Sequence, residues 1–206
     1  EREVVFDVLI IGGGVAGMSC ALVLGSAQHK PFATGKTIGV IAHQKASNLQ
    51  EAVFYNAYGI PPGTTGRKLL DSSREHLANQ YPHVQQINNE KVLRIEGDAP
   101  QFRVITNKNE YIAAAIVLAT NASNPFSIGG LEAYVRPHGK MHPDKNRLQL
   151  ENVDGLVKDG LYVAGTLAGT RSQLAIAAGS GAAVATDILT MWNNGVPAHS
   201  HDKLSR

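Results

Sequence analysis

The chain has 206 residues, of which 43% are hydrophobic and 17% charged, so it is long enough to bury a sizeable core. Its formal net charge is only +2 and its Lys and Arg residues are scattered, which argues against a nucleic-acid-binding protein. The uninterrupted apolar stretches are far shorter than the roughly 18 residues of a membrane span, and the N-terminus lacks the pattern of a secretory signal. Since Cys20 is the only cysteine, we expect a cytoplasmic protein with no nucleic-acid or membrane partner.

The N-terminal part of the chain predicts a β-α-β unit. Val4–Ile11 is a nearly continuous run of apolar and β-branched residues, typical of a strand buried on both faces of a parallel sheet. Residues 15–28 predict a helix with small residues toward the sheet, and Thr37–Ala42 predicts the next buried strand. After an irregular segment rich in Asn, Gly and Pro, residues 67–80 predict a second helix, which one of two preceding threonines would cap: Thr64 or Thr65.

The pattern changes after this helix. Residues 83–115 contain three short strand candidates separated by the turn-like sequences GDAP and NKNE, which predicts a three-stranded antiparallel meander. Ala115–Thr120 returns to a continuous apolar strand of the parallel type. Residues 121–157 are polar and show no clear core pattern.

Two further elements complete the predicted fold. Leu161–Ala164 predicts one more buried strand, and Ser172–Asn193 a long helix rich in Ala and Gly. We therefore predict an α/β fold: a single Rossmann-like domain over residues 1–194, with a parallel sheet, helices and the antiparallel meander. Residues 195–206 are expected to be a frayed tail.

Glycines follow the first strand at the spacing of a dinucleotide-binding turn. Gly12 permits the tight turn, Gly14 lets the backbone approach a diphosphate, and Gly17 lets the helix lie close to the sheet. Free N–H groups at the helix start, near Val15 and Ala16, would then face the phosphates. The alternative is a merely tight structural turn, but the position between a strand and a helix favours a nucleotide.

The usual acidic residue for ribose binding is missing from the end of the second strand, which reads IAHQK. His43 and Gln44 stand where a dinucleotide would pass. His43 and Lys45 would suit a phosphorylated ribose, or they are solvated loop residues. NAD is not supported by this site.

Four sequence elements together resemble, in the same order, the FAD-binding part of the thioredoxin reductase-like (pyridine nucleotide-disulfide oxidoreductase) flavoproteins. They are GGGVAG; YNAYG at Tyr55–Gly59 with Gly66 after it; the meander leading to VLATNAS; and GLYVAGTLAG followed by SQLAIAAGSGAAVATDI. The resemblance covers about residues 5–122 and 155–194. It implies that the cofactor is FAD, bound in an extended form.

The resemblance also implies positions for the parts of this FAD. The diphosphate would lie at the glycine turn, the adenine near Lys91 and Val92, and the flavin against Asn56. The start of the last helix offers N–H groups and a positive dipole to a reduced flavin, although its glycines also serve tight packing. Candidate contacts at the strand ends and this helix start are Thr120, Asn121, Gly165, Thr166, Gln173, Leu174 and Ala175.

The chain departs from the family pattern at four places. Thr166 replaces an Asp that holds the ribityl chain, and a hydroxyl cannot give charge-assisted acceptance. Asn121 replaces a Gly, which Asn can imitate if the turn needs a positive φ. The family's NADPH-binding domain is replaced by a short connection, residues 121–158, too short for a second nucleotide fold. The redox-active CxxC is absent, and Cys20 is expected to pack as a small apolar residue in the first helix, which excludes dithiol exchange by this chain alone.

No side chain stands out as a catalytic acid, base or nucleophile, so catalytic residues stay unassigned. His138 and His142 in HGKMH, and His199 and His201 in the tail, do not have the spacing of a metal site, and we expect a surface loop and no metal.

Two functions remain open. The first is a single-domain FAD oxidoreductase that receives electrons from a separate donor protein, a reduced flavin or diffusing NAD(P)H. The alternative is a non-catalytic FAD- or nucleotide-binding module that acts through a protein partner. A homodimer is a further expectation from the family.

Overall fold

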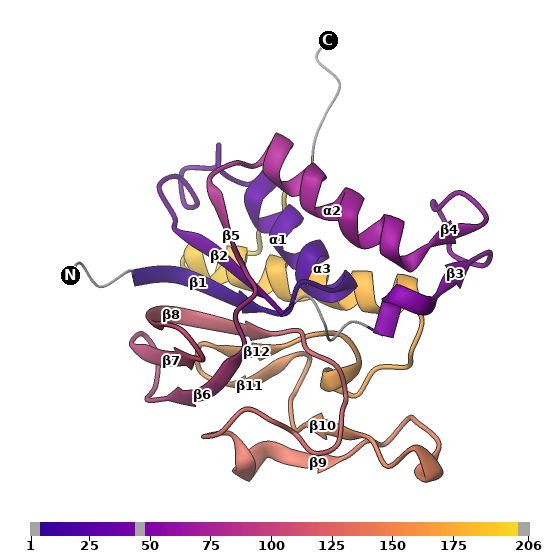
Figure 1. The fold of residues 1–206 in the computed structure, drawn as a ribbon. Helices are drawn as coiled ribbons and strands as arrows, with labels where there is room; N and C mark the ends of the chain where they lie inside the picture. Colours follow the sequence, from indigo (N-terminus) through magenta and orange to yellow (C-terminus); the bar gives the residue numbers. More distant parts are fainter. Residues whose placement is uncertain (1–4, 44–47, 202–206) are drawn as a thin grey trace.

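The computed structural model describes residues 5–43 and 48–201, which form an α/β domain around one eight-stranded sheet (Figure 1). Its central strand runs parallel to the neighbour on each side, and each neighbour pairs in parallel with one further strand. Along this path the strands are β11 (Leu156–Lys158), β12 (Leu161–Val163), β8 (Glu110–Leu118), β1 (Val5–Ile11), β2 (Ile38–Ala42) and β5 (Val84–Asn88). The Rossmann-like α/β prediction is confirmed.

The antiparallel meander is also present, but it shares a strand with the parallel sheet. β6 (Val92–Glu96) pairs with β7 (Phe102–Thr106), and β7 pairs with the first half of β8. The prediction of a separate parallel strand at residues 115–120 is wrong, because β8 runs unbroken through both regions. One edge of β8 pairs in parallel with β1, and its other edge pairs first with β7, antiparallel, and then with β12, parallel.

One strand of the parallel sheet was not predicted. β5 follows α2 and pairs with β2, but only its first residue is buried, and it lacks the continuous apolar run of β1 or β2. It lies at the outer edge of the sheet, where Gln85 and Asn88 are exposed to solvent.

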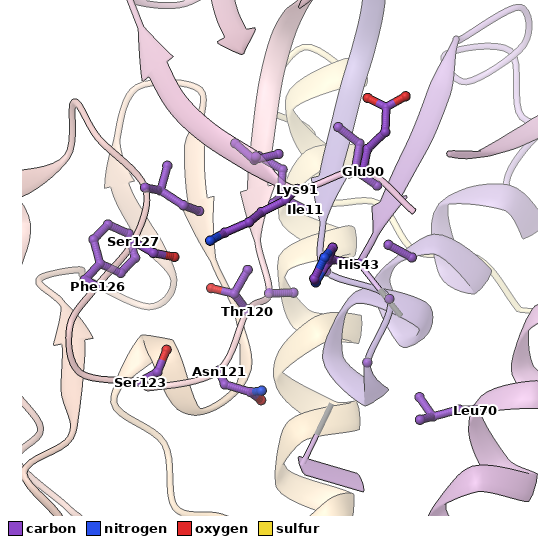
Figure 2. A pocket seen from close by; sticks show the side chains of 18 of the residues that line it. Ile11, His43, Leu70, Glu90, Lys91, Thr120, Asn121, Ser123, Phe126 and Ser127 are labelled. Carbon is purple, nitrogen blue, oxygen red and sulfur yellow. The ribbon is translucent and has the colours of Figure 1, made fainter. Parts of the chain in front are cut away.

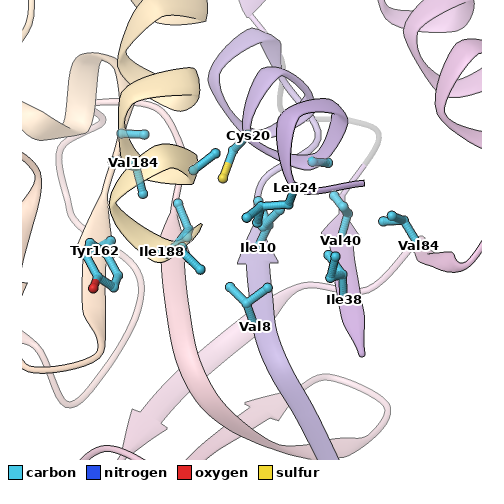
Figure 3. Packing of buried hydrophobic residues seen from close by; sticks show 14 of the residues in the cluster. Val8, Ile10, Cys20, Leu24, Ile38, Val40, Val84, Tyr162, Val184 and Ile188 are labelled. Atoms are coloured by element: carbon cyan, nitrogen blue, oxygen red, sulfur yellow. The ribbon is translucent and has the colours of Figure 1, made fainter. Parts of the chain in front are cut away.

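Three helices cover one face of the sheet: α1 (Val15–Ser26), α2 (Gly66–Gln80) and α3 (Leu174–Trp192). Side chains from β1, β2, α1 and α3 form a core between the layers (Figure 3), and Cys20 lies within it. The expected cap of α2 is confirmed, since Thr65 Oγ1 accepts a hydrogen bond from the Lys68 N–H. The two-residue strand β4 (Thr64–Thr65), directly before α2, pairs with β3 (Val53–Phe54) in a hairpin that projects from the domain (Figure 1).

The opposite face of the sheet carries a second core, and the connection 121–158 contributes to it. This connection contains the hairpin of β9 (Val135–Pro137) and β10 (Leu148–Leu150), and then β11. Ile128, Leu131 and Leu150 are buried beside Phe6 and Phe102 of the sheet and meander. The segment therefore contributes to a core although its sequence shows no core pattern, because its buried residues lie in loops and short strands and are spaced irregularly.

The chain beyond α3 is attached where the structure describes it. The Ala198 N–H donates to Thr190 Oγ1, and the hydroxyls of Ser26 and Ser200 are 2.8 Å apart. The expectation of a frayed tail is thus wrong for residues 196–200.

Among the described residues, α3 is long and apolar enough to cross a membrane, judged by length and composition only, with a mean hydropathy of 1.5. In this fold it lies along α1, and Val184, Ala185, Ile188 and Leu189 pack into the core below the helices.

Candidate functional site

The passage from β1 to α1 carries the glycine motif. Gly12 has a φ of +120°, and a Cβ at this position would lie 2.3 Å from the Ala119 carbonyl oxygen. A Cβ on Gly17 would lie 1.8 Å from the Gly12 carbonyl oxygen, so this glycine lets α1 pack against the turn. Gly14 differs from both, because a Cβ there would meet no atom within 4 Å. The turn is tight at two glycines and open at the third.

Gly14 borders a cavity of about 330 Å³, here called the glycine-turn cavity (Figure 2). It lies between the ends of β1, β2 and β8, the middle of α2 and the loop after β8. The predicted residues that line it are Gly12, Gly14, His43, Lys91, Val92, Thr120 and Asn121. Gln44 falls outside the described residues.

The lining of this cavity presents no carboxylate in place of the missing ribose-binding acid. Glu90 contributes to the lining, but its carboxylate points away from the cavity centre (Figure 2) and accepts hydrogen bonds from Thr106, Asn109 and Tyr111. Lys91 extends its amino group into the cavity instead (Figure 2). The polar groups that a ligand would meet here are therefore cationic or neutral.

A second cavity, of about 590 Å³, adjoins the first, and we call it the helix-start cavity. The two cavities share Gly14, Ala119, Thr120, Asn121 and Arg147. The predicted residues that line the second cavity are Gly14, Val15, Ala16, Asn56, Thr120, Asn121, Gly165, Thr166, Gln173 and Leu174. Gly17 and Ala175 line neither cavity.

Two helices begin at the helix-start cavity. Gly14 is the N-cap of α1 and Gln173 the N-cap of α3, and neither start has a side-chain cap or an acidic residue in its first turn. The first N–H groups of a helix have no partner within it, so both starts offer donors and a positive dipole. The helices come close because Gly181 leaves room for α1: a Cβ there would lie 1.9 Å from the Ala16 carbonyl oxygen.

A histidine that was expected in a surface loop holds one wall of this cavity. His138 is only 8% exposed. Its Nδ1 accepts a hydrogen bond from the Lys140 N–H, so the proton lies on Nε2, which donates to the Thr166 carbonyl oxygen at 2.9 Å. The surface-loop prediction is wrong for His138. It holds for His142, which is exposed and lines the cavity.

The sequence profile described as pyridine nucleotide-disulphide oxidoreductase matches residues 6–182. The chain belongs to this family. The matched region runs from β1 into α3 and so includes both helix starts.

Curated relatives match only part of their own length. The ferredoxin–NADP reductase of Streptococcus agalactiae is 29% identical over 123 residues, which are 57% of this chain and 35% of that protein. The ferredoxin–NADP reductase of Streptococcus mutans is 29% identical over 124 residues, 58% of this chain and 34% of that protein. The matched part of the chain is thus about a third of the length of these relatives.

Solved structures share the fold at low identity. A thioredoxin reductase from Gloeobacter violaceus is 16% identical with a TM-score of 0.72, and the match covers 99% of this chain and 100% of that one. A ferredoxin-flavin thioredoxin reductase from Clostridium acetobutylicum is 19% identical with a TM-score of 0.66, over 94% and 100% of the two chains.

In this family member, the only cysteine is far from a reactive state. Cys20 is completely buried between α1 and the sheet, and this burial raises the pKa of its thiol well above the ordinary value. No group of three or more His, Cys, Asp or Glu side chains that could hold a metal ion occurs within residues 5–43 and 48–201.

The sequence prediction missed the cations of the site. Lys140, Lys145, Arg147 and Arg171 line the helix-start cavity, and its lining contains no Asp or Glu. Lys140, Lys145 and Arg147 fall in a stretch of eight residues inside the connection 121–158, which has no core periodicity. This local concentration of positive charge is the one sequence signal that could have identified them. Asn121 does not have a positive φ, so the backbone at this position does not need the conformation that the family's glycine would allow.

Proposed function

We propose that this domain binds FAD across the two adjoining cavities and acts as the cofactor domain of an oxidoreductase. The observation that carries the proposal is that the uncapped starts of α1 and α3 line one cavity, which adjoins the cavity of the glycine turn. A dinucleotide with negative charge at both its diphosphate and its reduced flavin would use both starts.

The residues present fit such a cofactor. Gly14 borders both cavities, and the space beside its Cα is open to a diphosphate. Arg147 also lines both cavities and supplies a cation at their junction. Thr166 lines the helix-start cavity, where its hydroxyl can still form one hydrogen bond to a ribityl chain.

Each wall has its own task in this proposal. Gly12, Gly14 and the first N–H groups of α1 would hold the diphosphate, while Lys91 and Val92 would border the adenine. Asn56 and the free N–H groups in the first turn of α3, beginning at Leu174, would face the flavin, with Gln173 beside them. The flavin accepts and gives electrons when bound. His138 fixes the peptide of Thr166 and so keeps that wall in place.

The electron source is proposed to be a separate donor or diffusing NAD(P)H. The connection between β8 and β12 forms a hairpin and short strands that cover the sheet, and its sequence contains no second G-x-G-x-x-G. The relatives named ferredoxin–NADP reductase support electron transfer as the general activity. Since Cys20 is the only cysteine and is buried, we propose that no dithiol takes part.

Purification followed by an absorbance scan tests cofactor binding. We expect a yellow protein, or a colourless one that turns yellow with added FAD and keeps the colour through gel filtration. A protein that stays colourless after FAD addition would reject the proposal. Anaerobic titration with NADPH and with reduced mediators then tests activity: a bound flavin that none of them reduces would favour the non-catalytic alternative.

A further inference from the structure

The rim of the helix-start cavity carries more positive charge than a dinucleotide explains. Lys140, Lys145 and Arg171 line this cavity but not the glycine-turn cavity, where the diphosphate is proposed to lie. None of the three forms an ion pair with another residue in the part of the chain that the structure describes. The carboxylate of Asp144 lies beside His142 and is almost fully exposed. This uncompensated charge attracts an anionic partner.

The hairpin β3–β4 borders the same cavity and exposes aromatic side chains. Phe54 and Asn56 line the cavity, whereas Tyr55 is 76% exposed and Tyr58 is 99% exposed. Val53 adds a half-exposed apolar side chain, and the hairpin projects beyond the helical layer (Figure 1). Tyrosine is enriched in protein–protein interfaces, and Tyr55 stands between two residues that line this cationic cavity.

A small anion would contact the cations inside the cavity but would not reach tyrosines that lie outside its lining. A membrane surface is flat, whereas the cations surround a hollow. Only a partner protein with a convex acidic surface would contact the rim and the hairpin together. Electrostatic complementarity of this kind speeds encounter and fixes orientation.

We propose that the cations Lys140, Lys145 and Arg171 and the tyrosines Tyr55 and Tyr58 form a docking surface for an acidic electron-carrier protein. This inference rests on the proposed function, because the carrier would deliver electrons to the flavin behind the rim. Two reduced carriers each give one electron, and the bound flavin takes up both electrons together with one proton from solvent, which leaves the reduced flavin with its negative charge.

The test uses the FAD-loaded protein in an anaerobic stopped-flow experiment. The probe is an acidic [2Fe–2S] ferredoxin that is first reduced with dithionite and then freed of it, and the readout is the loss of flavin absorbance. FAD affinity is measured for each variant beforehand, so that only variants with full flavin occupancy are compared. A variant set that binds no FAD overturns the proposed function itself, and this inference with it.

The variants separate the docking surface from general charge effects. We expect the double variant Lys140→Glu/Arg171→Glu to lower the second-order rate about tenfold, and salt to lower the wild-type rate about tenfold between roughly 0.05 and 0.5 M. Tyr58→Ala should lower the rate severalfold while the salt dependence stays. Lys108→Glu makes one such charge reversal on the β7–β8 turn, away from the cavity, and should leave the rate unchanged.

Three results would overturn the inference while FAD binding stands. The first is a ferredoxin rate that neither salt nor the double variant changes. The second is a double variant that slows reduction by NADPH as much as reduction by ferredoxin, which would assign the rim to a small anionic nucleotide. The third is Tyr58-dependent binding to phosphatidylserine vesicles that blocks electron transfer, which would assign the surface to a membrane. Reduced methyl viologen, a cation, should reduce the double variant at least as fast as the wild type.

Discussion

At the scale of single residues, the three motif glycines separate folding from binding. Gly12 and Gly17 have no room for a Cβ, since backbone oxygens lie within 2.3 Å and 1.8 Å of where it would be. Gly14 has that room and a negative φ, so nothing in the fold requires a glycine there. The proposed FAD gives a reason for glycine at this position, because its diphosphate would approach the backbone closely.

Gly14→Ala tests this explanation. We expect its thermal unfolding midpoint to match the wild type and its FAD dissociation constant to rise at least about tenfold, because the methyl group occupies the space of the diphosphate. Gly179→Ala is the matched control: its Cβ would also meet no atom within 4 Å, and Gly179 lines neither proposed cofactor cavity. Isothermal titration with FAD measures the first effect, and equal FAD affinity of the two variants would contradict the assignment.

His138 gives a second prediction at this scale. His138→Phe keeps the volume of the ring but leaves the Lys140 N–H without its acceptor and removes one donor from the Thr166 carbonyl. We expect it to lower the free energy of unfolding by about 1–3 kcal/mol in urea denaturation. His138→Gln retains a donor and an acceptor and should recover part of this loss. If the Phe variant were as stable as the wild type, the two hydrogen bonds would not stabilise the cavity wall.

The sequence predicted residues that belong to motifs and missed residues that only the fold brings together. Gly12, Gly14 and Leu174 follow strand-to-helix signals whose geometry is local, so their places on the cavities could be anticipated. Arg147 and His138 come from a segment whose short strands and 3₁₀ turns show no period. Their contacts arise from long-range packing against the ends of β8 and β12, which no local pattern encodes.

At the scale of elements, the start of α3 carries a trade-off between helix stability and cofactor binding. Gln173 occupies the N-cap position without capping the helix, although Asp or Asn there would satisfy one of the free N–H groups. An uncapped helix N-terminus lowers the stability of the fold but leaves its N–H groups free to bind a ligand.

Gln173→Asp and Gln173→Asn separate the two effects of a cap. Both should stabilise the FAD-free protein by about 1 kcal/mol, because each side chain accepts a helix N–H. The Asp variant should bind FAD more weakly than the Asn variant. Its negative charge repels the anionic FAD and neutralises the positive end of the α3 dipole. Urea denaturation and FAD titration of the two variants measure this. An Asp variant that binds FAD as tightly as the wild type would place the flavin elsewhere.

The strands show why element boundaries were only partly predictable. β1 and β2 are buried on both faces, so their apolar runs identify them. β5 carries two glutamines and an asparagine in five residues, and its place in the sheet comes from pairing with β2 and not from its own hydrophobicity. β8 was divided in two because its first part alternates beside β7 and its second part is continuously buried.

At the scale of the whole molecule, the sheet is stabilised by a core on each face, and the two cores depend on different segments. The helices α1 and α3 supply one core, whereas the meander and the connection 121–158 supply the other. The glycine-turn and helix-start cavities lie where the ends of the parallel strands meet both layers, so each layer contributes walls: α1 and α3 from one side, Arg147 and His142 from the other. The connection is thus a structural layer as well as a part of the proposed site.

Leu150→Ala tests whether this connection is integral to the fold. Leu150 is completely buried in the second core, so the truncation should cost about 2–5 kcal/mol through lost burial and the cavity that it leaves. Leu156→Ala, on β11 in the same connection, removes a side chain that is 42% exposed and should cost only about 0.5 kcal/mol. Because both cores share one sheet, urea denaturation followed by tryptophan fluorescence at Trp192 and by circular dichroism should give coincident transitions in both variants. A Leu150→Ala protein that loses only circular dichroism, while Trp192 in the helical layer reports an unchanged midpoint, would show that the connection folds as a separate layer and that the helix starts are held without it.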